Sequence, residues 1–118
     1  MIGYKIIEIT DGKPFFMFCG FHGSRKLKVD TWLEAEKKMV KDGTSKMDYL
    51  SGFHVIAHDI EQMRKYSKRF KNKVGKYVVE VEYHTFDKKP TKGSLALLAD
   101  FMMLPKKSLE TAIPLEDL

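Results

Sequence analysis

Residues 51–86, SGFHVIAHDIEQMRKYSKRFKNKVGKYVVEVEYHTF, decide the fold that we predict for this chain of 118 residues. Residues 51–57 are a short apolar run entered through a glycine, which is typical of a buried strand. Asp59 then offers a helix N-cap, and the apolar residues that follow recur at helical spacing: Ile60, Met63, Tyr66 and Phe70. Residues 77–86 alternate at a period of two, with Tyr77, Val79, Val81 and Tyr83 on one face. The predicted order is therefore strand, helix, strand.

The N-terminal part of the chain predicts a β-hairpin. Residues 4–9 are rich in Tyr and Ile, and the dipeptide Asp11-Gly12 supplies the positive φ angles of a tight turn. A second apolar run follows over residues 15–18. Because Pro14 cannot donate to a strand ladder, this strand should begin after Pro14 or lie at an edge.

Two further segments complete the prediction. Thr31 and Glu34 fit a capping box, so we expect a helix from there to Gly43, with Trp32 in the core. Residues 100–104 should be a strand ended by Pro105, after a helical or irregular lead-in over 94–99. The predicted fold class is α+β: one compact domain over residues 1–104, with a mixed or antiparallel sheet of about five strands and two helices. Residues 105–118 should form a loosely packed C-terminal tail.

The composition points to a reducing compartment. Cys19 is the only cysteine, so the chain can form no internal disulfide and no thiolate-rich metal cage. The sequence shows neither a secretory signal nor a membrane span. We expect a cytoplasmic protein, in the host cytosol if a phage encodes it.

Positive charge gathers in one part of the chain. The formal net charge is +5, but residues 64–76 hold no acid and seven bases: Arg64, Lys65, Lys68, Arg69, Lys71, Lys73 and Lys76. Such a patch attracts anionic partners. The alternative is that these bases form only a solvated surface.

Other motifs give weaker indications of chemistry. Gly20 and Gly23 lie in a loop that could cradle a phosphate, but their spacing matches no phosphate-binding pattern, which favours a plain connection. Glu80, Glu82 and His84 share one face of the long strand and could form an acid/base set, or an ordinary solvated face that pairs with lysines. The histidines lack metal-site spacing, and His54 suits a structural role. We expect no metal, no cofactor and no catalytic residue.

Several short motifs resemble a widespread set of small, uncharacterised bacteriophage proteins. They are GYKI at 3–6, WLEAE at 32–36, SGFHV at 51–55, VEVE at 79–82 and the segment 93–103. The resemblance covers most of the chain up to Leu104. It implies a phage or prophage origin.

The central unit also looks like the middle of ADP-ribosyltransferase-like folds, in its Gly-aromatic-His strand, its helix with Arg64-Lys65-Tyr66 and its Val-Glu-Val strand. In those folds a similar unit lines the NAD site. The resemblance implies that Tyr66 stacks on nicotinamide, that Glu82 is the acid and that His54 lines the site. The chain departs from the family pattern at Tyr4-Lys5, where the first strand should carry His or Arg.

These observations support three hypotheses. The preferred one is a phage accessory protein without catalysis that binds nucleic acid or an acidic host protein complex, for example as an inhibitor of a defence system. Its partner-binding residues would be Arg64, Lys65, Lys68, Arg69, Lys71 and Lys73. The second is an NAD-consuming transferase, and the third is a virion component that associates through a sheet edge. The oligomeric state stays open.

Overall fold

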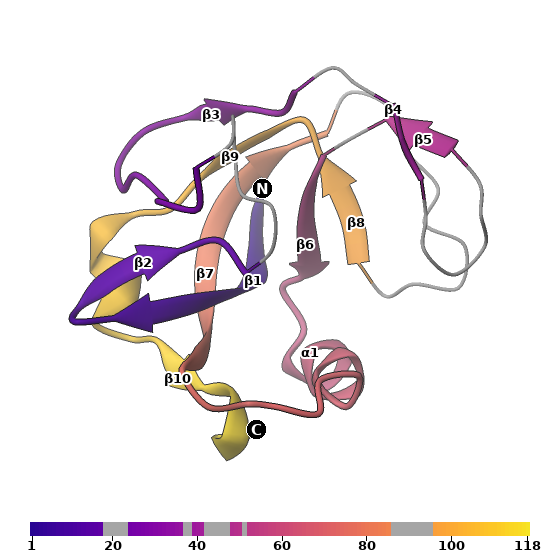
Figure 1. The fold of residues 1–118 in the computed structure, drawn as a ribbon. Helices are drawn as coiled ribbons and strands as arrows, with labels where there is room; N and C mark the ends of the chain where they lie inside the picture. Colours follow the sequence, from indigo (N-terminus) through magenta and orange to yellow (C-terminus); the bar gives the residue numbers. More distant parts are fainter. Residues whose placement is uncertain (18–23, 37–38, 42–47, 51, 86–95) are drawn as a thin grey trace.

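The computed structural model describes residues 1–17, 24–36, 39–41, 48–50, 52–85 and 96–118. Within them the chain forms strands, one α-helix and two short 3-10 helices (Figure 1). In chain order these are β1 (Ile2–Thr10), β2 (Lys13–Phe15), β3 (Leu33–Glu34), β4 (Met39–Lys41), β5 (Asp48–Leu50), β6 (Phe53–Ala57), α1 (Ile60–Ser67), β7 (Lys76–His84), β8 (Ala96–Ala99), β9 (Phe101–Met103), η1 (Lys106–Leu109), β10 (Ile113–Pro114) and η2 (Leu115–Asp117).

One sheet of eight strands dominates the molecule, in the order β3-β9-β7-β1-β6-β8, with β2 added to β1 and β10 added to β7. Every strand pair in it is antiparallel. The two longest strands, β1 and β7, lie side by side in its middle and pair from Ile2 opposite Glu82 to Glu8 opposite Lys76. The strands β4 and β5 form a separate hairpin.

The predicted fold class is wrong. The described residues form a mostly antiparallel sheet of eight strands with one α-helix, in place of about five strands and two helices. The helix expected from Thr31 to Gly43 is replaced by β3 and β4.

Tertiary pairing explains why that helix does not form. Leu33 pairs with Met102 and is buried, and the amide of Ala35 donates to the carbonyl of Asp100 at 2.8 Å. The Thr31 hydroxyl donates to the Val29 carbonyl and does not cap a helix. A capping box contributes only about 1 kcal/mol, which these long-range contacts exceed. Trp32, expected in the core, is 46% exposed.

The hairpin and its turn are confirmed, but the second strand, expected over residues 15–18, is β2 (Lys13–Phe15) and residues 16–17 are not in a strand. Asp11 and Gly12 have φ angles of 53° and 74°, and they join β1 to β2 with Thr10 opposite Lys13. Pro14 lies inside β2, where its carbonyl accepts from the amide of Leu27 at 3.3 Å. The turn chemistry was therefore readable from two residues.

The central strand, helix and strand are also confirmed as β6, α1 and β7. The carboxylate of Asp59 accepts from the Glu61 amide at 2.9 Å, as an N-cap does. Met63 is fully buried, and it packs in a cluster with Ile6, Ile56, Val78 and Leu115. The helical stripe that predicted α1 is thus the stripe that contacts the sheet.

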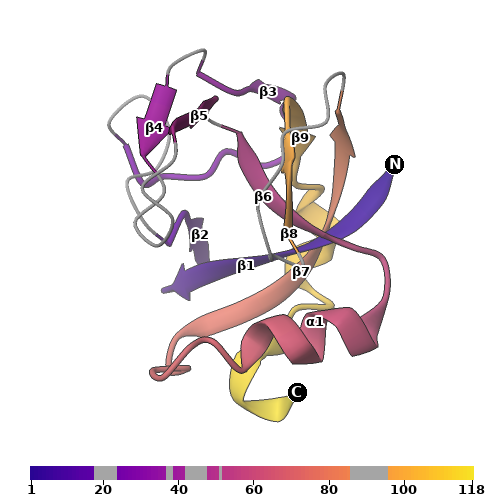
Figure 2. The same cartoon turned by 90° about the vertical axis from the view of Figure 1, so that its right-hand side faces the viewer.

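The sheet has two unequal faces. We call the face that carries Ile7, Val79 and Val81 the inner face, and it is covered by a large core that includes Phe16, Leu27, Leu33 and Phe53. The opposite, outer face carries Ile6 and Val78, and α1 and the C-terminal residues cover this part of it (Figure 2).

A close approach of β1 to β6 requires glycine at position 3. A Cβ atom there would lie 2.5 Å from Val55 Cγ1 and 2.7 Å from the Ile56 carbonyl oxygen. Both distances are shorter than real contacts, and the second involves backbone that cannot turn aside. Gly3 therefore fixes how closely these two strands pair.

The C-terminal part differs in detail from the prediction. The strand expected over 100–104 exists as β9, but the lead-in that we expected to be helical or irregular contains β8. Leu98 pairs with His54 and is buried, which explains the strand. Within residues 105–118, Leu115 is fully buried and Ile113 pairs with Val78.

No helix among the described residues is both long and apolar enough to cross a membrane.

Candidate functional site

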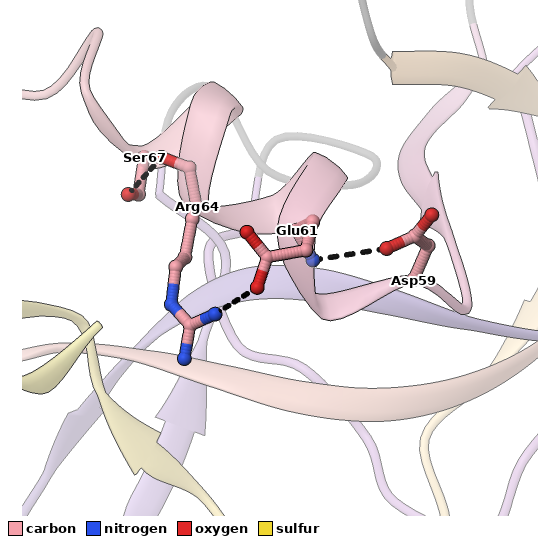
Figure 3. A network of polar contacts seen from close by, with 4 residues as sticks. All are labelled: Asp59, Glu61, Arg64 and Ser67. Atoms are coloured by element: carbon pink, nitrogen blue, oxygen red, sulfur yellow. Dashed lines mark hydrogen bonds and ion pairs between the residues drawn. The ribbon is translucent and has the colours of Figure 1, made fainter.

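The bases predicted to bind a partner do not share one environment. Arg64 pairs with Glu61 one turn earlier on α1 (Figure 3). Arg69 lies over the ring of Tyr66, with its guanidinium carbon 5.4 Å from the ring centroid. Lys73 is half-buried, whereas Lys65, Lys68 and Lys71 are exposed.

We call the last three, Lys65, Lys68 and Lys71, the cationic helix surface. They recur every three residues, which places Lys65 and Lys68 as neighbours on the helix surface. In the described part of the chain, none of the three has an ion pair with a carboxylate. Their charge is therefore available to a partner.

Local contacts hold the helix that presents this surface. Figure 3 shows the N-cap bond from the Glu61 amide to Asp59 and the ion pair between Arg64 and Glu61. The Ser67 hydroxyl donates to the Arg64 carbonyl at 2.7 Å and satisfies one of the last carbonyls of the helix. Because the buried Met63 lies on the side of α1 that faces the sheet, Lys65 and Lys68 lie on the opposite side of the helix.

The three residues that the ADP-ribosyltransferase resemblance singled out occupy separate surroundings. Tyr66 packs edge-on against Phe70, with 5.7 Å between the ring centroids, in the cluster that contains Val78. Burial raises the pKa of Tyr66, and the positive Arg69 opposes the rise. Glu82 lies four residues beyond Val78 on β7, a separation of about 13 Å along a strand. The contacts of the described residues join none of Tyr66, Glu82 and His54.

His54 is instead linked to a buried lysine. The ammonium of Lys5 donates to the His54 carbonyl at 2.9 Å, and it lies 6.0 Å from the centroid of the Phe16 ring. Lys5 is only 8% exposed, and this burial lowers the pKa of its amine to about 8. The pKa of the His54 imidazole is lowered, mainly by desolvation and secondly by the positive charge of Lys5. The ring keeps contact with solvent, so its desolvation is partial.

Sequence reasoning missed this lysine, although a signal was present. Lys5 alternates with Gly3 and Ile7 along β1, so it occupies a position that the period of two assigns to the inner face. A charged residue at such a position is a candidate for a buried ion. The resemblance had marked the same residue only as a departure.

Of the two acidic side chains of β7, Glu80 is held by a neighbour that the sequence did not indicate. Glu80 and Glu82 do share the outer face, as their register with Tyr4 and Ile2 shows. The partner of Glu80 is His58, whose Nε2 lies 2.8 Å from Oε1, in place of a lysine across the sheet. The His58 ring stacks on Tyr4, with 4.7 Å between centroids.

His84, the third member of that set, stacks on Trp32 with 5.0 Å between ring centroids. The predicted set of Glu80, Glu82 and His84 lacks a nucleophile, and its imidazole is stacked on Trp32, as that of His58 is on Tyr4. Burial raises the pKa of Tyr4, with Glu80 and Asp59 adding to the rise, so its phenol stays protonated. These groups form a recognition surface more readily than a catalytic centre.

Two expectations stay outside these observations. The glycine loop with Gly20 and Gly23 lies outside the described residues, as does Cys19. In the part of the chain that is described, no three His, Cys, Asp or Glu side chains are grouped closely enough to hold a metal ion.

Comparison with known proteins adds no relative: no protein-family model, no curated protein and no solved structure matches the chain.

Proposed function

We propose that this chain is a binding protein without catalysis of its own, which contacts the phosphate backbone of nucleic acid through the cationic helix surface. The observation that carries the proposal is the exposure of Lys65, Lys68 and Lys71 without an acidic partner among the described residues. Phosphate contacts by lysine depend on charge more than on fixed geometry. Three exposed ammonium groups without an acidic partner are therefore sufficient for salt-dependent affinity.

The helix itself needs only part of this charge. Cations near the C-terminus of a helix stabilise it through the macrodipole, and Arg64 and Lys65 lie in the last turn of α1. Lys71 lies beyond the helix and contributes nothing of this kind. Charge in excess of what the helix uses favours a role in binding.

The resemblance to small phage proteins supports an accessory role in infection. In that setting the partner would be nucleic acid itself or a host nucleoprotein, and inhibition of a defence complex is one form that the role could take. We commit to nucleic acid because phosphate is the ligand that a surface of solvated lysines binds with the fewest geometric requirements.

The test is fluorescence anisotropy of a labelled DNA duplex titrated with the protein at several salt concentrations. We expect affinity to fall steeply with salt, because binding releases counterions from the DNA. The double variant Lys65→Glu/Lys68→Glu should bind weakly and lower the slope of log affinity against log salt by about two, one for each lysine that no longer neutralises a phosphate.

Lys107→Glu is the matched control, since Lys107 is an exposed lysine on η1 and should change the slope little. An unchanged slope in the double variant would refute the proposal. Equal binding of polyglutamate that disappears in the same variant would assign the surface to an acidic protein instead.

A further inference from the structure

Among the described residues, α1 and the C-terminal segment cover one end of the outer face of the sheet. Beyond the part under α1, β1 and β7 continue with Ile2 and Tyr4 opposite Glu82 and Glu80. Ile2 is 51% exposed, and Trp32 from the chain before β3 is 46% exposed. We call the outer-face residues Ile2, Tyr4, Trp32, Glu80, Glu82 and His84 the open sheet face.

Register places these side chains on one surface. Residues directly opposite each other in an antiparallel pair point to the same side. Glu82 lies between Ile2 on β1 and Met103 on β9, and His84 lies opposite Phe101. Trp32 joins them because its indole stacks on the His84 ring at an interplanar angle of 24°.

The stacked pair presents a rigid aromatic surface to solvent. The imidazole of His84 supports one side of the indole, and nearly half of the Trp32 surface stays exposed. Aromatic side chains that are exposed and held in place are typical of recognition sites, because their binding costs little conformational entropy.

The charge of the open sheet face is opposite to that of the cationic helix surface. The positions that flank Glu80 and Glu82 in the sheet carry Tyr4, Ile2 and Met103, and none carries lysine or arginine. Among the described residues, the Glu80 carboxylate accepts from His58, and Glu82 has no ion pair. The Met1 ammonium donates to the Tyr83 carbonyl at 3.1 Å and, in the part of the chain that the structure describes, pairs with neither Glu80 nor Glu82. Phosphate would be repelled from this surface.

We propose that the open sheet face binds an arginine-bearing, extended segment of a partner protein, with one guanidinium stacked on Trp32 and paired with Glu82. Guanidinium is planar, stacks on aromatic rings and donates in pairs to carboxylates, which lysine does not do. Glu80 and Glu82 are about 7 Å apart along β7, the spacing of alternate residues in an extended peptide. This inference does not depend on nucleic-acid binding, since the two surfaces share no residue.

Trp32 makes the proposal directly measurable, because it is the only tryptophan of the chain. The probe is a short acetylated peptide in which arginine alternates with threonine, titrated into the full chain while the tryptophan emission is recorded. We expect a saturable change of emission with the arginine peptide. The same peptide with citrulline, which keeps the shape of arginine without its charge, should give no saturable change.

Variants locate the binding residues, with affinity measured by anisotropy of the labelled peptide. Glu82→Gln removes the carboxylate that would pair with the guanidinium and should weaken binding about fivefold. Trp32→Ala removes the stacking surface and should weaken binding about threefold, whereas Trp32→Phe should retain most of the affinity. Glu116→Gln, an exposed acid on η2, is the matched control and should bind as the unchanged protein does.

Four results would overturn the proposal. The first is equal binding of the citrulline peptide, and the second is undiminished peptide binding by a Glu82→Gln variant whose thermal melt is unchanged. The third is DNA binding that depends on Trp32 as strongly as on Lys68. The fourth is self-association, measured by sedimentation, that both Trp32→Ala and Lys68→Glu abolish. The third would assign the face to nucleobases and the fourth to the cationic helix surface of a second copy.

Discussion

The cationic helix surface and the open sheet face belong to the same side of the sheet, yet they are built in different ways. At one end α1 lies against the sheet (Figure 2), where Met63 packs with Ile6 and Val78 while Lys65 and Lys68 stay exposed. At the other end the His58 ring contacts Tyr4 and Glu80, while Ile2 is exposed and Glu82 has no ion pair among the described residues, so strand side chains form the surface. One face therefore carries an adaptable cationic charge on a helix and a fixed acidic and aromatic surface on strands.

The difference shows how covering part of a sheet creates two kinds of surface. Lysine side chains on a helix adapt to a partner, and their binding is mostly electrostatic. Side chains on a strand are ordered by register, and stacking holds Trp32 and Tyr4 against imidazoles. We expect the first surface to be tolerant of partner shape and the second to be selective.

Two methionines provide the strongest test of this contrast. Met63 is fully buried beneath α1, whereas Met103 is half-buried beside Glu82 on the open part. Met63→Ala should lower the free energy of unfolding by about 3 kcal/mol, because it leaves a cavity. Met103→Ala should lower it by less than about 1 kcal/mol. Urea denaturation measures both, and equal losses would mean that the two parts of the face are covered alike.

A second test compares a covered lysine with an open one. Lys5 has a pKa near 8 in the folded chain and about 10.5 when unfolded, so between these values the unfolded chain binds more protons. Folding stability should therefore rise as the pH rises from 8 to 10.5, by up to roughly 3 kcal/mol at about 1.4 kcal/mol per pKa unit. Lys5→Met should stabilise the protein near neutral pH and flatten this rise.

Lys68→Met is the control for that test, because Lys68 is exposed and should leave the pH dependence as it was. Thermal melts over this pH range decide the matter. A wild-type profile that stays flat between pH 8 and 10.5 would show that the Lys5 amine is solvated.

The smallest effect is expected at Trp32. A buried tryptophan replaced by alanine costs about 3 to 5 kcal/mol, but Trp32→Ala should cost under about 1 kcal/mol because nearly half of its surface is already in water. The emission of the free protein should also be that of an indole in contact with solvent. A blue-shifted emission together with a large loss of stability would place Trp32 in the core and show that the open sheet face is not exposed.

Local patterns predicted the parts of this fold whose partners are close in the sequence. Asp11-Gly12 encodes the turn between β1 and β2, and Asp59 with the stripe through Met63 encodes α1. The cluster of bases that follows was also visible in the sequence, and of its members only Lys73 and Lys76 are half-buried. Short-range signals suffice where the conformation is stabilised within a few residues.

The pattern around Thr31 shows that local signals fail where the partners of a segment are distant in the sequence. A capping box and a run of good helix formers predicted a helix, but pairing of Leu33 with Met102, nearly seventy residues away, made it a strand and left Trp32 outside the core. The candidate sites depend on contacts of the same kind. Tyr4, His58 and Glu80 meet only because β1 pairs with both β6 and β7.

The sequence by itself thus determined the hairpin, the amphipathic helix and the concentration of positive charge beside it. Tertiary structure alone decided which part of the outer face is covered, which aromatic rings stay exposed and that Lys5 is buried beside the His54 carbonyl. The physical reason is that local preferences contribute about 1 kcal/mol or less each, whereas strand register buries whole side chains and aligns residues that are distant in the chain.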